Sequence, residues 1–155
     1  MKRISADHKA VHFQLNERER DALVQILQTY PVLPPAHQPV SKELKKAQVL
    51  EYQHLLDEAL AEQRAANQRQ LHAWLAAPGR FRKTKPGLRL KLERADSEWL
   101  FQVLNDVRVG HWLRLGSPEI GEVNPESLAP ELVPAWVAMQ LSGFFQVSLL
   151  EALER

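Results

Sequence analysis

The sequence predicts a mainly α fold: a single-domain helical bundle with a small two-stranded β ribbon. Two segments carry the bundle, because residues 97–115 are apolar nearly all round a helix and residues 132–150 carry no formal charge. Only two short stretches, 10–15 and 88–93, alternate apolar and polar residues as strands do. A chain of 155 residues with 45% hydrophobic content fits one domain, residues 1–155.

The N-terminal part is expected to contain a strand, a helix and an extended connection. Apolar side chains alternate with polar ones over residues 10–15, which indicates a half-buried strand. Asn16 and Glu19 then have the spacing of a helix capping box, and the helix is expected to run to Tyr30. Four prolines within residues 31–40 exclude a regular helix there and predict an extended connection.

The middle of the chain predicts a long helix followed by a strand. Residues 41–77 contain no proline or glycine and favour one helix, with a break in the polar stretch 62–70 as the alternative. After a basic link, 80–87, three leucines alternate with charged residues over 88–93. This strand is expected to pair with 10–15 as a ribbon whose apolar face packs against a helix.

Two buried helices are expected in the C-terminal half, joined by a loop over 117–134 with a short turn at 125–128. Asp96 or Ser97 would cap the first helix, and Gly116 would end it. The last segment is long enough to span a membrane, but its polar residues are spread around the helix, which favours a buried helix. The two helices are expected to pack together. The predicted contacts join Trp99, Val103 and Val107 to Trp136, Phe144 and Val147.

Charge and cysteine content exclude several classes of function. The net charge is +1, so no global field favours nucleic acid, a membrane surface or an acidic substrate. The absence of cysteine excludes disulfides and thiolate chemistry. No apolar segment follows the basic residues at the start, and we expect a cytoplasmic protein.

Residues 80–94 form a basic segment, with seven cations against the single acid Glu93 and with Phe81 among them. Such a segment could follow a phosphate backbone while Phe81 stacks on a base. It could also bind an acidic protein, or only protect a ribbon edge from strand addition. The partner-binding candidates in it are Arg80, Arg82, Lys83 and Lys85.

The predicted central helix carries polar and apolar residues that need partners. Asn105, Asp106, Arg108 and Arg114 are expected to form a buried polar network that fixes how helices pack, with a ligand site as the alternative. Phe101, Val109 and Trp112 lie on the side opposite the main apolar face. Phe101 and Trp112 are therefore the apolar partner-binding candidates, which a partner or a second subunit would cover.

No catalytic or metal-binding pattern is evident. Glu51 and His54 have the spacing of one half of a di-iron motif, but those sites need two such motifs and further carboxylates. There is no glycine-rich phosphate loop, nucleophile elbow or His/Asp/Glu set. We therefore expect no metal and no cofactor, and enzyme activity has no support in the sequence.

Three stretches resemble an uncharacterised bacterial family known as domain of unknown function twenty-seventeen. Residues 104–108, Leu-Asn-Asp-Val-Arg, with Arg-Leu at 114–115, resemble the family's Leu-Asn-Asp-x-Arg stretch and later Arg-Leu. Residues 13–27 resemble its first strand and helix, and residues 145–149 its closing Leu-Gln-x-Ser-Leu. Trp112 stands where the family has a glycine. The resemblance implies no activity, but genes of that family lie beside the adaptor of the Clp protease, which implies a protein-binding or regulatory role.

The sequence therefore predicts a cytoplasmic protein that acts through protein–protein contacts, regulatory or adaptor-like, with a homodimer as one form. The alternative is a nucleic-acid-binding module that uses residues 80–94. An enzyme whose site is assembled from distant residues is the third reading.

Overall fold

The computed structural model describes residues 1–33, 46–119, 121 and 123–153, and in residues 46–50 it describes the backbone only. In chain order, the elements are β1 (Lys2–Ala6), β2 (Ala10–Leu15), α1 (Glu17–Gln28), α2 (Lys46–Ala76), β3 (Phe81–Thr84), β4 (Gly87–Glu93), α3 (Arg94–Arg114), the 3-10 turns η1 (Pro125–Ser127) and η2 (Pro130–Leu132), and α4 (Val133–Leu153).

The described chain folds as a mixed α/β structure, so the predicted bundle with a two-stranded ribbon is wrong. Four strands form one antiparallel sheet in the order β1-β2-β4-β3, and four helices accompany it. Both strands that the sequence did not indicate, β1 and β3, lie at the edges of the sheet. Edge strands bury little side chain, and the sequences of β1 and β3 therefore lack the apolar alternation of a half-buried strand.

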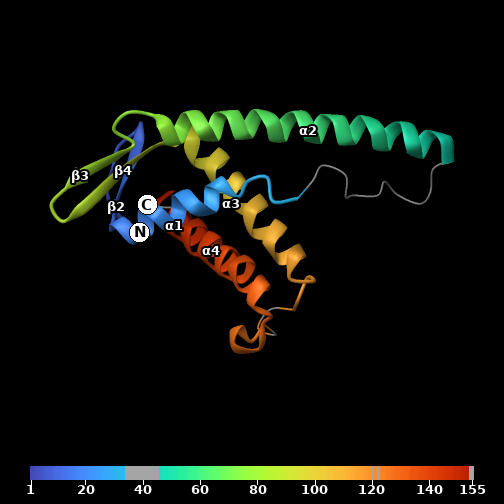
Figure 1. Ribbon diagram of the computed structural model, residues 1–155. Coiled ribbons are helices and arrows are strands. Elements are labelled where there is room, and N and C mark those ends of the chain that lie inside the picture. Colours follow the sequence, from blue (N-terminus) through green and yellow to red (C-terminus); the bar gives the residue numbers. More distant parts are fainter. Residues whose placement is uncertain (34–45, 120, 122, 154–155) are drawn as a thin grey trace.

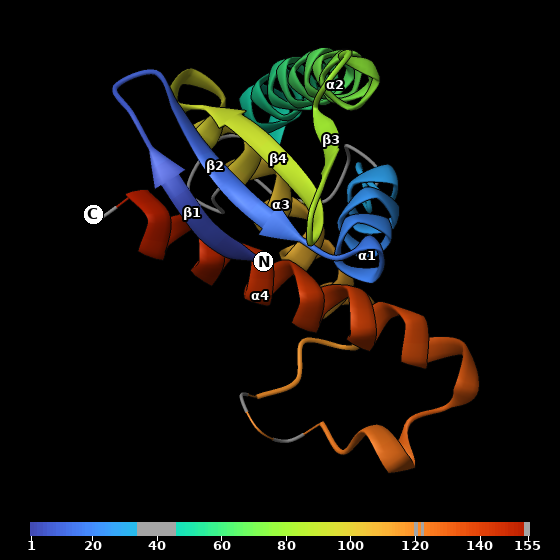
Figure 2. The same ribbon diagram turned by 90° about the vertical axis from the view of Figure 1, so that its left-hand side faces the viewer.

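The two strands that were predicted are confirmed, and they pair as expected at the centre of the sheet. Val11, Phe13 and Leu15 of β2 lie opposite three leucines of β4, and all six side chains are buried. Figure 2 looks onto the sheet, and α3 lies behind it. The apolar side chains of the sheet therefore face the helices, while the alternate residues face away from them.

A local sequence signal marks the start of α1 but not that of α3. The Asn16–Glu19 capping box of α1 is present, with Asn16 Oδ1 accepting from Glu19 N at 2.8 Å and Glu19 Oε2 accepting from Asn16 N at 2.9 Å. Helix α3 begins directly after β4, with Glu93 at its N-cap. Ser97 lies inside the helix, where its hydroxyl donates to the carbonyl of Glu93 at 3.2 Å. The predicted cap at Asp96 or Ser97 is therefore wrong, because strand passes into helix without a loop.

Helices α3 and α4 pack against each other, as predicted, and Val103 and Val107 of α3 are buried in the core as expected, but Trp99 and the residues predicted on α4 lie elsewhere. Phe145 and Leu149 of α4 are buried in the core, whereas Phe144 and Val147 are exposed. Trp99 of α3 lies against α2, with its ring 6.4 Å from that of Trp74. The main apolar face of α3 is the one that turns inward, as its sequence indicates, whereas α4 is apolar on more than one face and its sequence left open which of them does so.

Helix α2 is one continuous helix over its described length, as predicted. Its C-terminal end is fixed to the body by Leu71 and Trp74, which are buried. Its N-terminal half extends away from the body in Figure 1, and Tyr52 and Leu55 are exposed there. Most of the predicted proline-rich connection lies outside the described residues.

Candidate functional site

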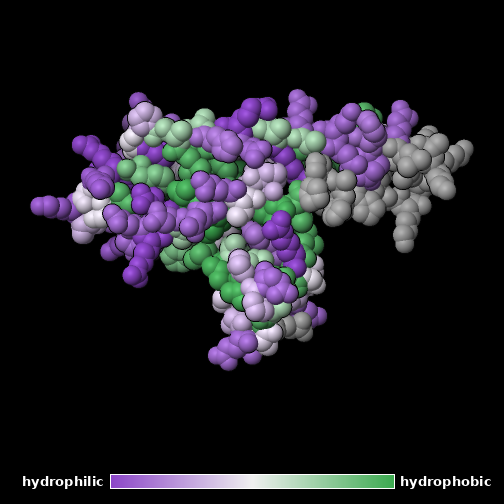
Figure 3. All heavy atoms as spheres, in the orientation of Figure 1, coloured by the Kyte–Doolittle hydropathy of each residue, from purple (hydrophilic) through white to green (hydrophobic). Residues whose placement is uncertain are grey.

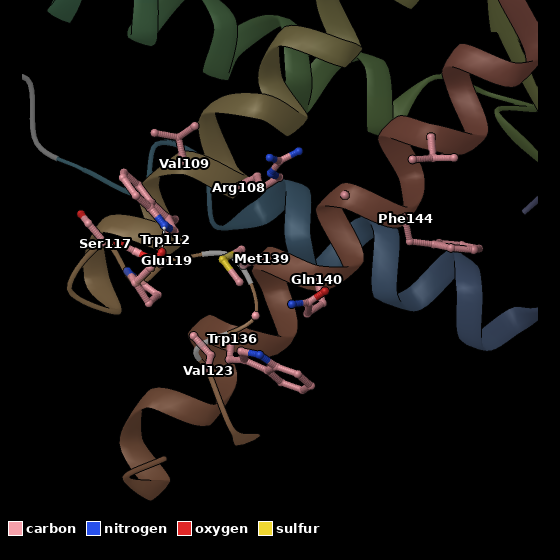
Figure 4. Close-up of a pocket in the computed structure, with 14 residues that line it drawn as sticks. Arg108, Val109, Trp112, Ser117, Glu119, Val123, Trp136, Met139, Gln140 and Phe144 are labelled. Atoms are coloured by element: carbon pink, nitrogen blue, oxygen red, sulfur yellow. Dashed lines mark hydrogen bonds between the residues drawn. The ribbon is translucent and has the colours of Figure 1, made fainter. Parts of the chain in front are cut away.

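A groove of about 1230 Å³ lies between α3, α4 and the loop that joins them. Its character is apolar and aromatic. Figure 4 shows Met139 extending from α4 toward the α3 side of the groove, where Trp112 lies. The apolar residues that matter most along it are Val109, Trp112, Trp136, Met139, Phe144 and Val147.

The chain reversal at the end of α3 positions one wall of this groove. Gly116 has φ 84° and Ser117 has φ 56°, both in the left-handed region that favours glycine. Ser117 N donates to the carbonyl of Trp112 at 3.1 Å, which closes the last turn of the helix. The indole Nε1 of Trp112 donates to the carbonyl of Pro118 at 2.9 Å. Trp112 is therefore held by its polar end, with its ring free to line the groove.

Helix α4 contributes an exposed apolar stripe beside the groove, formed by Val137, Phe144, Val147 and Leu150. Phe144 is 47% exposed and Val147 is 54% exposed. Single exposed apolar residues are ordinary, but these four share one helix, and Phe144 and Val147 also line the apolar groove. The segment Pro130–Leu153 is also the one helix of the described chain with the length and composition of a membrane span, a test that core helices of water-exposed domains pass as well.

The opposite face of α4 holds the helix in place through a buried amide. Gln146 is 4% exposed, its Oε1 accepts from Arg108 Nη1 at 3.3 Å, and its Nε2 donates to Asn105 Oδ1 at 3.5 Å. Because these contacts come from two successive turns of α3, they fix the rotation of α4 as well as its distance. This rotation turns Phe144 outward.

The predicted buried polar network is wrong in its burial: Asn105, Asp106, Arg108 and Arg114 are all exposed residues of α3. They nevertheless connect α3 to its surroundings. Arg114 Nη2 donates to the carbonyl of Val32 at 3.0 Å. The residues that are both polar and buried are Ser97, His111, Ser142 and Gln146. The helix presents its longer polar side chains to the rim, where water completes their hydrogen bonds.

Asp106 faces a second cleft, of about 470 Å³, between α2, α3 and residues 30–33. Asn67 of α2 crosses its inner end: Nδ2 donates to Tyr30 Oη at 3.2 Å and Oδ1 accepts from Trp99 Nε1 at 3.3 Å. Desolvation in the cleft raises the pKa of Asp106, and the charge of Arg64 opposes that rise. Desolvation also raises the pKa of the Tyr30 phenol. The polar contacts across this cleft join α2 to the rest of the fold.

Of the four partner-binding candidates in the basic segment, one is a structural cation and three are exposed. Arg80 lies 4.5 Å from the centre of the Trp74 ring, and its guanidinium donates to the carbonyls of Trp74 at 3.1 Å and Lys91 at 2.9 Å. It is therefore engaged within the fold and is a poor candidate for partner binding. Arg82, Lys83 and Lys85 are exposed.

The three aromatic residues that the sequence singled out differ in burial and in what they contact. Phe81 is half-buried and meets the Trp74 ring edge-on at 6.4 Å, so it offers no face on which a base could stack. Phe101 is also half-buried, whereas Trp112 is 38% exposed and lines the groove. Of the two apolar candidates on α3, the structure places only Trp112 at the groove.

Sequence reasoning missed the stripe on α4. A signal was present, because Val137, Phe144 and Val147 follow one another at spacings of seven and three residues, as in the seam of a coiled coil. It was hidden by the apolar residues on the other sides of the same helix. No group of three or more His, Cys, Asp or Glu side chains that could hold a metal ion occurs among the residues that the structure describes.

Comparison with family models, with curated proteins and with solved structures gives no match for this chain.

Proposed function

We propose that the protein acts through protein–protein contacts made by the exposed face of α4 and the adjoining groove, in a regulatory or adaptor-like role. A homodimer is the form that we favour. The observation that carries the proposal is that exposed apolar residues of α4, among them Phe144 and Val147, line one groove together with Trp112 and Met139.

The spacing of the stripe supports association with another helix. Val137, Phe144 and Val147 occupy seam positions of a heptad pattern, and Gln140 occupies the one between the first two. Gln140 is exposed. A polar residue at one seam position selects register and number of partners at a cost in stability. Two copies related by a two-fold axis would bring each stripe onto the other, with the two Gln140 amides close enough to pair.

The energetics favour covering the stripe and the groove together. Full burial of a Val, Leu or Phe side chain contributes roughly 1.5–3 kcal/mol, and side chains that are already half-buried contribute less. Association must also offset the loss of rigid-body freedom, which costs about 4–15 kcal/mol. Four half-exposed side chains on α4 are therefore too few alone, and Trp112, Val109 and Met139 of the groove belong to the same interface.

Sedimentation equilibrium on the full chain tests the proposal. We expect a monomer–dimer equilibrium that Phe144→Glu shifts to monomer, because the substitution places a charge in the seam. Leu55→Glu is the matched control, since Leu55 is 56% exposed in the N-terminal half of α2, and Figure 1 shows that half of the helix extending away from α4. It should leave the equilibrium unchanged. A protein that stays monomeric at every concentration, or that dissociates equally with Leu55→Glu, contradicts the homodimer.

A further inference from the structure

The outer face of the sheet gathers cations from strands that are far apart in the sequence. The strand register places Lys2 of β1 opposite Gln14 of β2, Gln14 opposite Arg89 of β4, and Arg89 opposite Arg82 of β3. These four residues form one row across all four strands. They alternate with the buried apolar residues, so they belong to the face that looks away from the helices.

A second row strengthens the positive character of this face. Lys91 lies opposite His12, two residues along β4 from Arg89 and therefore about 7 Å from it. Glu93 is the one acidic residue among the outer-facing positions of β1, β2, β3 and β4, and its carboxylate pairs with Lys91 at 3.3 Å. The outer face, defined here by Lys2, His12, Arg82, Arg89 and Lys91, thus has four cations against one acid.

Three of these cations have no partner within the described part of the chain. No hydrogen bond or ion pair there involves Lys2, Arg82 or Arg89 through the side chain. Arg82 and Arg89 are moreover a directly opposed cross-strand pair, and like charges in that position destabilise a sheet. An anion between the two guanidinium groups would remove this repulsion.

Protection of sheet edges does not account for the arrangement. Cations on edge strands prevent unwanted strand addition, and this reason covers Lys2 on β1 and Arg82 on β3. Arg89 and Lys91, however, belong to β4, a central strand with neighbours on both sides. Protection of an edge therefore does not explain their positive charge, which lies on the face of the sheet.

The chemistry of the face selects the kind of anion. Apart from the imidazole of His12, neither row contains an apolar or aromatic side chain, whereas protein interfaces are enriched in Tyr, Trp and Phe at their centre. Because Phe81 is directed to the core side against Trp74, no stacking platform favours single strands either. A duplex has the densest phosphate charge, about one per 1.7 Å of axis, and gains most from a flat cationic surface.

We propose that the outer face of the sheet binds the phosphate backbone of duplex nucleic acid without sequence preference, through Lys2, Arg82, Arg89 and Lys91. This inference is independent of the α4 interface. It also differs from the nucleic-acid hypothesis drawn from the basic segment, since Arg80 and Phe81 are engaged in the core and Lys2 joins from the other end of the sheet.

Fluorescence anisotropy with a labelled duplex DNA tests the proposal. Four phosphate contacts predict a log–log salt slope of about −3.6, which is roughly a hundredfold loss of affinity between about 50 and 200 mM salt. Arg82→Gln/Arg89→Gln removes two contacts. We expect it to halve the slope and to weaken binding at low salt by at least about tenfold.

The matched control is Arg18→Gln/Arg69→Gln, which removes the same charge from exposed positions of α1 and α2 that do not belong to the outer face of the sheet. It should change the affinity by less than about twofold. Thermal unfolding of both double variants verifies that they fold. Single strands of the same length should bind more weakly than the duplex.

Four outcomes overturn the proposal: no binding at low salt, equal weakening by the control variant, tighter binding to single strands, or tighter binding to poly-glutamate or anionic vesicles than to duplex. The poly-glutamate result assigns the face to an acidic protein, and the vesicle result assigns it to a membrane surface.

Discussion

The guanidinium of Arg108 on α3 donates from Nη1 to Oε1 of Gln146 on α4 across 3.3 Å, so an exposed cation at the rim of the groove is joined to a buried amide of the neighbouring helix. This contact links a buried residue of the α3–α4 packing, Gln146, to an exposed residue of the groove, Arg108. With Gln146 turned inward, the apolar residues on the far side of α4 are left outside the core.

The first prediction concerns Gln146. Gln146→Leu removes the hydrogen bonds to Arg108 and Asn105 but keeps the volume, and both former partners are exposed and can bond to water. Its cost should be within about 1 kcal/mol of unfolding free energy. Gln146→Ala leaves a void as well and should cost about 1–3 kcal/mol. Urea denaturation of both variants measures the difference, and a larger loss for the leucine variant would show that the hydrogen bonds outweigh the packing.

The second prediction concerns pH. Desolvation, followed by the charge of Arg114, lowers the pKa of His111 below its usual 6.5. His111 Nε2 lies 3.3 Å from the Thr29 hydroxyl, which itself donates to the Ile26 carbonyl at 2.7 Å. Nε2 is therefore assigned as the donor, and Nδ1, which is buried without a partner, would have to take up the proton.

Because the folded state holds this proton less tightly than the unfolded state, stability is fully present above pH 6.5 and falls as the pH drops below that value. Unfolding free energies between about pH 7.5 and 5 should show this decline, and His111→Gln should flatten it. An equal decline in the variant would assign the pH dependence to other groups.

The third prediction contrasts two glycines in the middle of helices. A Cβ on Gly110 of α3 would lie 2.6 Å from Cβ of Val32, where the chain crosses the helix, whereas a Cβ on Gly143 of α4 meets nothing nearer than Arg108 Cδ at 3.9 Å. Gly110→Ala should therefore destabilise by about 1–3 kcal/mol through overpacking. Gly143→Ala should stabilise by about 0.5–1 kcal/mol through helix propensity.

Thermal unfolding at low protein concentration, where self-association is minimal, measures both glycine variants. Val32→Gly is the accompanying test, since removing the obstructing side chain should reduce the cost of Gly110→Ala. If that cost does not change, contact with Val32 is not the reason why α3 needs a glycine at position 110.

The fourth prediction separates two neighbouring arginines. Arg80→Gln loses the contact over the Trp74 ring and the hydrogen bonds to two carbonyls. It should destabilise by about 1–2 kcal/mol. Arg82→Gln removes an exposed side chain without a partner in the described chain and should change stability by less than about 0.5 kcal/mol. Denaturation midpoints that move equally would contradict the structural role of Arg80.

The sequence by itself determined the elements whose signals are local. The alternation of β2 and β4 located the central strands, because each buries one face, and the Asn16–Glu19 capping box located the start of α1 because both of its hydrogen bonds form within one turn. The absence of proline and glycine in α2 likewise predicted one continuous helix.

Only the tertiary structure decided the edge strands, the inward face of α4, and the grouping of charges. Strands β1 and β3 each pair with the next strand along the chain, and they bury too little side chain to show an apolar alternation in the sequence. A helix that is apolar on several sides has no single face that its sequence can assign to the core, and Phe144 and Phe145 were therefore indistinguishable before packing. Lys2 and Arg82 are eighty residues apart in the chain and meet in one row only through register, which is set by pairing across the sheet and not by neighbouring residues.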